Sequence, residues 1–244
     1  MKILFFDMEF ANGKIPGSVY SFGYVRTDRK FRLTEPQTDL LINPDCEWND
    51  YVRRNILAYQ MSTVKQASLF PAYYKRMKKL LCKSDLVVGF AVKNDTTALR
   101  KACERYGLKP LSFRCLDLER VCRSLRDYPQ AHGLDGYVRA YTGIDPANRH
   151  RSDGDAYATM LLLKGICEKH GVDVRDWQRF TQPRLRTLCR RKCRKGKRAN
   201  GLPGRGQRQS RTKRQSAEPV QKNEIDWHKV FLVLFSLHKK RRLR

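Results

Sequence analysis

Runs of apolar residues in the first 120 positions predict β-strands. The run ILFFDMEF at 3–10 is apolar on both faces, which is typical of a strand in the centre of a covered sheet. The β-rich stretch at 18–27 (SVYSFGYVRT) follows a turn with Gly and Pro, so we expect it to pair with the first strand. Three shorter strands are predicted at 39–44, 86–90 and 113–117.

Helical patterns occur between and after these strands. Helices are predicted at 70–81, 94–107, 118–125, 133–143 and 153–170. Asn94 or Asp95 is suited to the N-cap of the second of these helices, and Gly107 is suited to its end. The last helix carries an apolar stripe of Ala156, Met160, Leu163 and Cys167. Three strands followed by alternating helices and strands predict an α/β domain with a mixed sheet.

Charge divides the chain into two parts. Of the net charge of +27 over 244 residues, the segment 184–244 contributes +18, with 21 basic and 3 acidic residues. This segment is polar and rich in Gly, Pro, Gln and Ser, so we expect a domain at 1–183 and a basic, largely disordered tail at 184–244. Such a charge favours binding to a polyanion, and nucleic acid is a more common partner than an anionic membrane.

One short apolar segment, VFLVLF at 230–235, interrupts the tail. It is too short to span a bilayer, although its basic flanks would let it lie on a membrane surface. Docking on the domain as a short helix or strand is the simpler interpretation. The chain starts without a charged and then apolar leader, so we expect a cytoplasmic protein whose eight cysteines are reduced.

Two acidic residues lie within the first predicted strand. Asp7 and Glu9 are two positions apart and therefore share a face, roughly 6.5–7 Å from each other. Two carboxylates buried without a partner would be costly. Either the strand emerges into water at this end and both acids are solvated, or a hard divalent cation lies between them.

Three more polar residues stand at positions where α/β proteins often build sites. Asp95 follows the buried strand at 86–90, Asp155 lies in the first turn of the last helix, and His150 precedes Asp155 by five residues. Each has a simple structural explanation: an N-cap for Asp95, the helix dipole for Asp155 and solvent exposure for His150. Their order along the chain is more informative than any one of them.

The stretches ILFFDMEF, VVGFAVKNDTTAL and HRSDGDAYATMLL together resemble the DEDDh family of 3′–5′ exonucleases, also called the DnaQ-like or ribonuclease T/proofreading family. The resemblance covers about residues 1–170. It implies a ribonuclease H-like mixed sheet flanked by helices. It also implies that Asp7, Glu9, Asp95 and Asp155 hold two Mg²⁺ or Mn²⁺ ions and that His150 is the general base.

The chain departs from the family pattern at two positions. Phe10 follows the Glu where many members have Thr, and Phe90 stands where many have His. Neither is an acid or the base, so the implied catalysis is unaffected, but recognition of the 3′-terminal nucleotide is expected to differ. Phe10 either stacks on a base or belongs to the core. Asp153 is an alternative ligand, although the five-residue spacing from His150 favours Asp155.

The predicted function is a metal-dependent 3′–5′ exonuclease that hydrolyses phosphodiester bonds at single-stranded DNA or RNA ends and releases nucleoside 5′-monophosphates. The basic tail would hold the substrate without reading its sequence. The alternatives are a non-catalytic nucleic-acid-binding protein of the same fold and a membrane or partner adaptor that acts through the tail. The sequence leaves open the choice between DNA and RNA and whether a polymerase or another protein is a partner.

Overall fold

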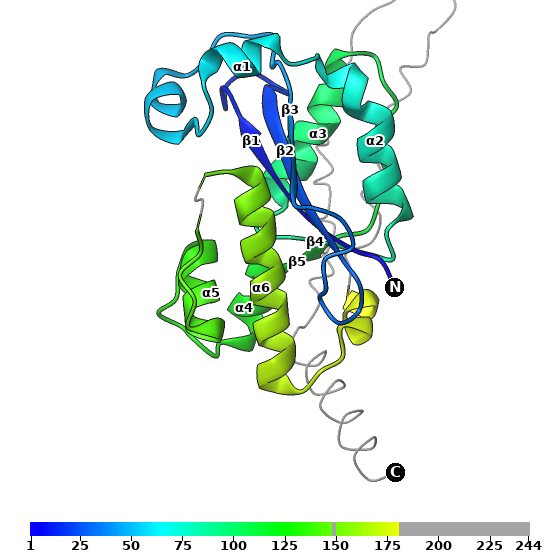
Figure 1. Cartoon of the computed structure of the whole chain (residues 1–244), viewed down its shortest axis with the longest axis vertical. Coiled ribbons are helices and arrows are strands. Elements are labelled where there is room, and N and C mark those ends of the chain that lie inside the picture. Colours follow the sequence, from blue (N-terminus) through cyan, green and yellow to red (C-terminus); the bar gives the residue numbers. More distant parts are fainter. Residues whose placement is uncertain (148–149, 181–244) are drawn as a thin grey trace, which may run out of the picture. The chain divides into compact units, whose positions relative to one another are not determined.

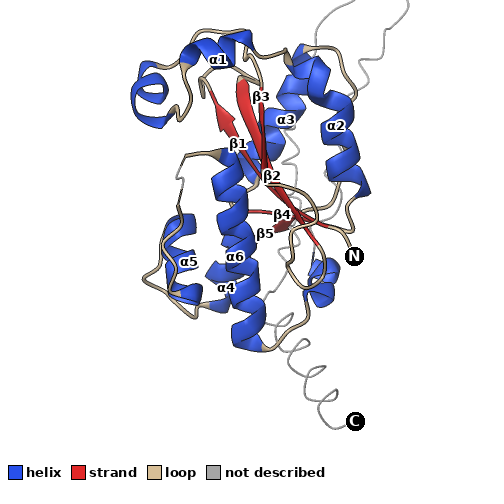
Figure 2. Ribbon diagram, viewed as in Figure 1, coloured by secondary structure: helices blue, strands red, loops and turns tan. Residues whose placement is uncertain are grey.

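A computed structural model describes residues 1–147 and 150–180, and these residues form a five-stranded sheet with helices on both faces (Figures 1 and 2). The strands are β1 (Ile3–Phe10), β2 (Val19–Thr27), β3 (Thr38–Leu41), β4 (Leu86–Gly89) and β5 (Leu116–Asp117). They lie in the order β3-β2-β1-β4-β5. The first three are antiparallel neighbours, whereas β4 and β5 run parallel to β1. The mixed sheet predicted from the sequence is confirmed.

Six α-helices connect and cover the strands in the described ranges. They are α1 (Met61–Gln66), α2 (Phe70–Lys83), α3 (Lys93–Arg105), α4 (Leu118–Leu125), α5 (Gly133–Thr142) and α6 (Ser152–His170). A π-helical turn at Val52–Ile56 and a 3₁₀ helix at Val174–Phe180 complete the set. The predicted cap of α3 is wrong: Val92 is the N-cap, without a side-chain hydrogen bond, and Asp95 lies inside the first turn.

The side chains of β1 alternate between two hydrophobic clusters, as its sequence predicts. Ile3 and Phe5 pack in a cluster with residues of α4, α5 and α6. Leu4 and Phe6 pack on the other face with residues of α2 and α3. Figure 1 shows these two groups of helices on opposite sides of the sheet. Because β1 is covered on both faces, polar side chains on it must find partners at its ends.

The parallel pair β1 and β4 sets the position of the acidic residues. The two strands pair from Ile3 with Leu86 to Phe5 with Val88, so both carboxyl ends lie at the same edge of the sheet. Asp7 and Glu9 lie beyond the last pair on β1, and β4 leads from this edge into α3, which carries Asp95 in its first turn. This edge is therefore where acids from separate segments meet.

The start of α6 lies directly against β2 at Gly23. A side chain at Gly23 would overlap the backbone of Ser152 and Asp153, so only glycine allows this approach. The close contact brings the first turn of α6, with Asp155, to the face of the sheet that carries Asp7 and Glu9.

Two predictions concern residues outside the described part of the chain. The basic tail at 184–244 and its apolar segment at 230–235 lie there, so the domain boundary after residue 183 stays a prediction. Within residues 1–147 and 150–180, no helix is long and apolar enough to cross a membrane.

Candidate active site

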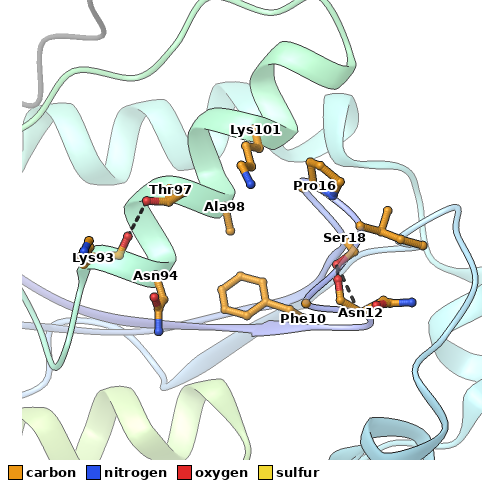
Figure 3. A pocket seen from close by; sticks show the side chains of 12 residues that line it. Phe10, Asn12, Pro16, Ser18, Lys93, Asn94, Thr97, Ala98 and Lys101 are labelled. Carbon is orange, nitrogen blue, oxygen red and sulfur yellow. Dashed lines mark hydrogen bonds between the residues drawn. The ribbon is translucent and has the colours of Figure 1, made fainter.

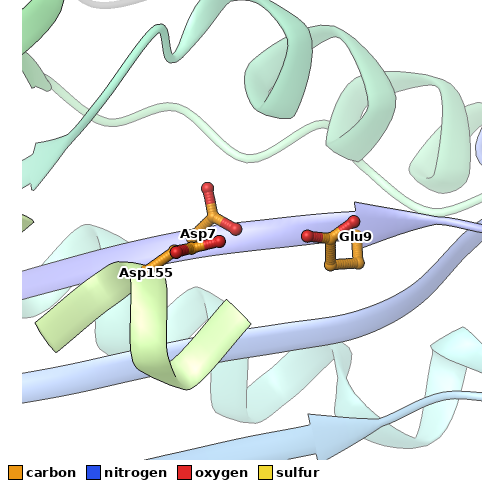
Figure 4. Close-up of side chains that lie close together, drawn as sticks. All are labelled: Asp7, Glu9 and Asp155. Carbon is orange, nitrogen blue, oxygen red and sulfur yellow. The ribbon is translucent and has the colours of Figure 1, made fainter. Parts of the chain in front are cut away.

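Three carboxylates converge at the edge where β1 ends. Ligand oxygens of Asp7, Glu9 and Asp155 all lie within 4.8 Å of one another. Figure 4 shows Asp7 and Glu9 on β1 and Asp155 reaching toward them from α6. All three residues are half-buried, so the site is open to solvent on one side. The structure thus brings together three of the four acids singled out in the sequence.

Asp95 lies at the same edge but outside this close cluster. It is 5% exposed in the first turn of α3, and its negative charge contributes to the raised pKa of Asp7 and of Glu9. Its own pKa is raised by burial and then by the charge of Asp117. Asp117 ends β5 and accepts hydrogen bonds from the backbone N–H groups of Ala91 and Glu119.

Burial and mutual repulsion raise the pKa of Asp7 and of Glu9. The pKa of Asp7 is raised well above its usual value by burial first, and then by the charges of Asp95, Asp155 and Glu9. The pKa of Glu9 is raised to about 8, again by burial first and then by Asp155, Asp95 and Asp39. Within the described residues, neither Asp7 nor Glu9 forms an ion pair with a basic side chain. In the described part of the chain, no basic side chain therefore offsets the burial of these two acids.

The donor set fits a hard divalent cation. Such ions bind clustered carboxylate oxygens, and the ligand oxygens of Asp7, Glu9 and Asp155 lie close enough together to share one. A cation among Asp7, Glu9 and Asp155 would also offset the repulsion that raises the pKa values of Asp7 and Glu9. Asp95, buried beside them, is placed to add negative charge to the same region.

His150 faces the same site from the segment before α6. It is exposed, has a left-handed backbone (φ 62°) and lines a cavity of about 250 Å³ together with Asp7, Phe90, Leu134, Asp135 and Asp155. The residue predicted as general base thus shares a cavity with two of the predicted metal ligands. Phe90, which departs from the family pattern, forms part of the cavity wall.

A polar network that the sequence did not reveal holds the start of α6. Asp39 on β3 accepts hydrogen bonds from Ser21 (2.6 Å), from Ser152 (3.1 Å) and from the Tyr59 hydroxyl. The hydroxyls of Ser21 and Ser152 also contact each other. Ser152 begins α6 three residues before Asp155, and Ser21 is paired with Glu9 across the strands. The network therefore links the two strands to the helix that supplies the third carboxylate.

Asp153, the alternative ligand, has other partners. Its carboxylate accepts hydrogen bonds from Gln37 (3.0 Å) and Arg151 (3.1 Å), and it does not belong to the three-carboxylate cluster. The structure places Asp155 there instead.

A larger cavity of about 460 Å³ lies beside the cluster, between the β1–β2 turn and α3 (Figure 3). Phe10, which directly follows Glu9, is half-buried at its wall and also packs against the core cluster under α2 and α3. Polar and basic side chains of α3 line the opposite wall, among them Lys93, Asn94, Thr97 and Lys101. Phe10 therefore combines a core contact with a position open to a ligand.

Comparisons with known structures return exonucleases of the same fold. A 3′-exonuclease described in 3′-end-specific recognition of a histone mRNA stem-loop matches with TM-score 0.57 and 14% identity, over 70% of this chain and 83% of its own. The nuclease domain of 3′hExo, a DEDDh family member, bound to rAMP, matches with TM-score 0.54 and 14% identity, over 70% and 92%. E. coli exonuclease I in complex with a dA16 oligonucleotide matches with TM-score 0.56 and 20% identity, over 73% and 42%, so this chain spans less than half of it.

Sequence comparisons agree with the fold. No curated protein matches the chain. The family model RNase_T, described as Exonuclease, matches residues 4–163, which include β1, α3 and the start of α6. The order of acidic motifs, the mixed sheet and this match lead to one assignment. The chain belongs to the RNase T family of exonucleases and is a nuclease of ribonuclease H-like fold.

Proposed function

We propose that the protein is a metal-dependent 3′–5′ exonuclease that removes nucleoside 5′-monophosphates from single-stranded ends of DNA or RNA. The observation that carries this proposal is the convergence of the Asp7, Glu9 and Asp155 carboxylates next to a cavity lined by His150. The similar structures support either nucleic acid, since one is described with a histone mRNA stem-loop and another with a dA16 oligonucleotide.

Asp7, Glu9, Asp155 and Asp95 would hold two Mg²⁺ or Mn²⁺ ions. When bound, such ions make water a better nucleophile and stabilise charge on the attacking and leaving oxygens of a phosphodiester. The carboxylates would position the ions, and the side of the cluster that is open to solvent would leave room for the substrate and the attacking water.

His150 would accept the proton of the attacking water. Imidazole is suited to this role because it gains and loses a proton near neutral pH. Its exposed position at the wall of the 250 Å³ cavity lets the accepted proton pass to solvent afterwards. Phe90 and Leu134 supply the apolar part of the lining of this cavity.

The 460 Å³ cavity would receive the terminal nucleoside. Phe10 offers an aromatic face, and base–aromatic stacking contributes about 1–3 kcal/mol per base without selecting a sequence. Lys93 and Lys101 on the α3 side would interact with the phosphates. Phe10 lies on the face of β1 opposite to Glu9, so the strand of nucleic acid would have to pass the end of β1 to bring its terminal phosphodiester to the carboxylate cluster.

The test is digestion of 5′-labelled and 3′-labelled single-stranded and double-stranded DNA and RNA with Mg²⁺, with Mn²⁺ or with EDTA. We expect mononucleotides to be the first product from 3′-labelled strands and a ladder of shortened products from 5′-labelled strands. Activity in excess EDTA, or internal fragments as first products, would contradict the proposal. Binding without cleavage in either metal would instead support the non-catalytic alternative.

A further inference from the structure

A second polar cavity lies outside the site described above. It measures about 210 Å³, and its charged lining consists of Lys2, Arg26, Glu35, Arg76, Lys79 and Lys83. Five cationic side chains thus surround one carboxylate in a space large enough for a single small anion group. The nuclease mechanism uses none of these residues.

The cavity is separated from the carboxylate cluster by the sheet. Arg26 and Tyr24 lie on the face of β2 that packs on α2, as do Leu4 and Phe6 of β1, whereas Asp7 and Glu9 lie on the α6 face. The cavity also lies at the opposite end of β1, since Lys2 precedes Asp7 by five residues, or about 17 Å along an extended strand. A group bound here therefore does not touch the site of hydrolysis.

Two guanidinium groups are held in fixed positions at the cavity. Arg76 on α2 donates a hydrogen bond to the Tyr24 hydroxyl (2.6 Å), and Tyr24 is buried. Arg26 donates from Nη1 to Glu35 Oε2 (3.0 Å). The Nε–H of Arg26 is buried and, within residues 1–147 and 150–180, donates to no acceptor. A fixed guanidinium with an unused donor is suited to an oxyanion.

Three lysines complete the lining without ion pairs of their own. In the described part of the chain, the side chains of Lys2, Lys79 and Lys83 have no carboxylate partner, and all three are exposed. Glu35 is paired with Arg26 through Oε2, and its buried Oε1 accepts no hydrogen bond in the described residues. Five cationic side chains against this one carboxylate leave the space with an excess of positive charge. A planar arginine guanidinium that is held in place, with flexible lysine side chains around it, is suited to binding phosphate oxygens.

We propose that this cavity binds a phosphate group, either of a small phosphorylated molecule or of a nucleic-acid backbone. The proposal does not depend on the nuclease function, because the cavity shares no residue with the carboxylate cluster. In a nuclease, a backbone phosphate held here would fix a part of the strand distant from the end being cut.

The experiment compares two double variants of the full-length chain. Lys79→Gln with Lys83→Gln removes two lysines of the cavity. Lys75→Gln with Lys78→Gln removes two exposed lysines of the same helix that do not line it. Both variants lose two positive charges and keep the basic tail. A difference in phosphate binding between them therefore comes from the position of the lysines and not from the total charge. The work is done in EDTA, which prevents phosphate from binding through metal ions at the carboxylates.

Inorganic phosphate is titrated at constant ionic strength, and melting temperature and heat of binding are measured. We expect phosphate to stabilise the wild-type protein and the Lys75/Lys78 variant equally, and its affinity for the Lys79/Lys83 variant to drop by roughly tenfold. Equal phosphate affinities and equal phosphate-induced shifts of melting temperature in the two variants would overturn the proposal. Melting temperatures without phosphate show whether both variants are folded.

A single-stranded oligonucleotide distinguishes the two sources of phosphate. If a backbone phosphate reaches the cavity, the slope of log affinity against log salt becomes shallower in the Lys79/Lys83 variant by about 1.4, at about 0.7 per lost contact, and stays unchanged in the other variant. If the two variants differ in their affinity for inorganic phosphate but have the same salt slope with the oligonucleotide, the cavity is assigned to a small phosphorylated molecule. Loss of nuclease activity has no bearing on either result.

Discussion

The carboxylates of Asp7, Glu9 and Asp155 are brought together at a cost to the free protein. Their oxygens lie within 4.8 Å of one another, and burial and repulsion raise the pKa values of Asp7 and Glu9. A cation bound among them stabilises the folded state, because the unfolded chain has no such arrangement. Cation binding and stability are therefore linked at this site. Single substitutions can distinguish them when stability is measured with and without the cation.

Asp7→Asn should lower the rate of hydrolysis by roughly 10²–10³-fold or more, because it removes one of the carboxylates proposed to hold the ions. The same change should raise the melting temperature of the metal-free protein, since it removes a buried charge from a repulsive cluster. It should also remove most of the stabilisation by Mg²⁺. Calorimetry with and without Mg²⁺ checks this, and Asp50→Asn, at an exposed acid, is the control. An undiminished Mg²⁺ effect in Asp7→Asn would exclude Asp7 as a ligand.

The raised pKa of Glu9 predicts that the stability of the metal-free protein depends on pH. Its pKa in the folded state is about 8, raised from 4.5. Between pH 4.5 and pH 8, Glu9 is therefore mostly protonated in the folded protein and mostly ionised in the unfolded chain. The free energy of unfolding should therefore fall as pH rises from about 4.5 to 8 and change little from this cause above 8. Urea unfolding in EDTA measures it.

In Glu9→Gln this decline should be shallower, and the variant should be more stable than wild type at pH 8 by about 1 kcal/mol or more. Saturating Mg²⁺ should reduce the decline in the wild-type protein, because the cation favours the ionised carboxylate. Equal pH profiles of wild type and Glu9→Gln would show that Glu9 does not keep its proton in the folded protein.

His150→Ala should lower the rate of hydrolysis by roughly 10²–10⁴-fold, the usual contribution of a general base. It should leave the stabilisation by Mg²⁺ almost unchanged, since the carboxylates remain. His132→Ala is the matched control, because His132 is also exposed but lies outside the 250 Å³ cavity. Near-normal turnover of His150→Ala at pH 7 would show that His150 is a solvent-exposed loop residue without a role in catalysis.

Among the elements, the contact between α6 and β2 has the largest effect on the site. Gly23→Ala would force the backbone of Ser152 and Asp153 away from β2 and move Asp155 away from Asp7. We expect a loss of about 2 kcal/mol or more in stability and a larger loss in kcat than in substrate affinity. Gly136→Ala on α5 is the control, because a side chain there meets its nearest atoms at 3.7 Å, an ordinary contact, and lines none of the three cavities. Full activity in Gly23→Ala would show that the site tolerates a displaced α6.

Elements with a continuous pattern were predictable from the sequence. β1 and α4 have the predicted boundaries, and α2 extends two residues further, because their apolar positions repeat at strand or helix spacing. In the predicted strand at 113–117, only Leu116 and Asp117 pair with β4, although Phe113 and Cys115 are buried. Apolar residues reveal burial, and they do not reveal which of them join a sheet.

The polar parts of the site were predictable only where they fit a known order of motifs. The acids and His150 were found in that way, whereas Asp39, Ser21 and Ser152 were not. Ser152 and Asp39 are 113 positions apart, and a hydrogen bond over that distance leaves no local pattern. The turns at 52–66 were missed for a related reason, because Val64 is the one fully buried residue in the two helical segments there.

At the scale of the whole molecule, charge is the dominant property. The first 183 residues carry +9 and the remaining 61 carry +18. Truncation after residue 183 should leave hydrolysis at saturating substrate intact, because it removes none of the proposed ligands. Binding to single strands should weaken at low salt, and the slope of log affinity against log salt, about −0.7 per contact, should become shallower.

The melting temperature of the same truncated protein is the second measurement. If residues 230–235 instead dock on the domain, removing them exposes an apolar surface, and the protein should melt earlier and aggregate. An unchanged salt slope in a stably folded truncation would show that the tail does not hold the nucleic acid.

The carboxylate cluster joins residues from both ends of the folded domain. Asp7 and Glu9 belong to its first strand, and Asp155 belongs to its last long helix, so the site exists only after the chain has closed a loop of nearly 150 residues. A ribosome that has released β1 to α5 has made all five strands of the sheet, but not the helix that supplies the third carboxylate. The order of synthesis therefore assembles the carboxylate cluster only after α6 has been made and has docked on the sheet.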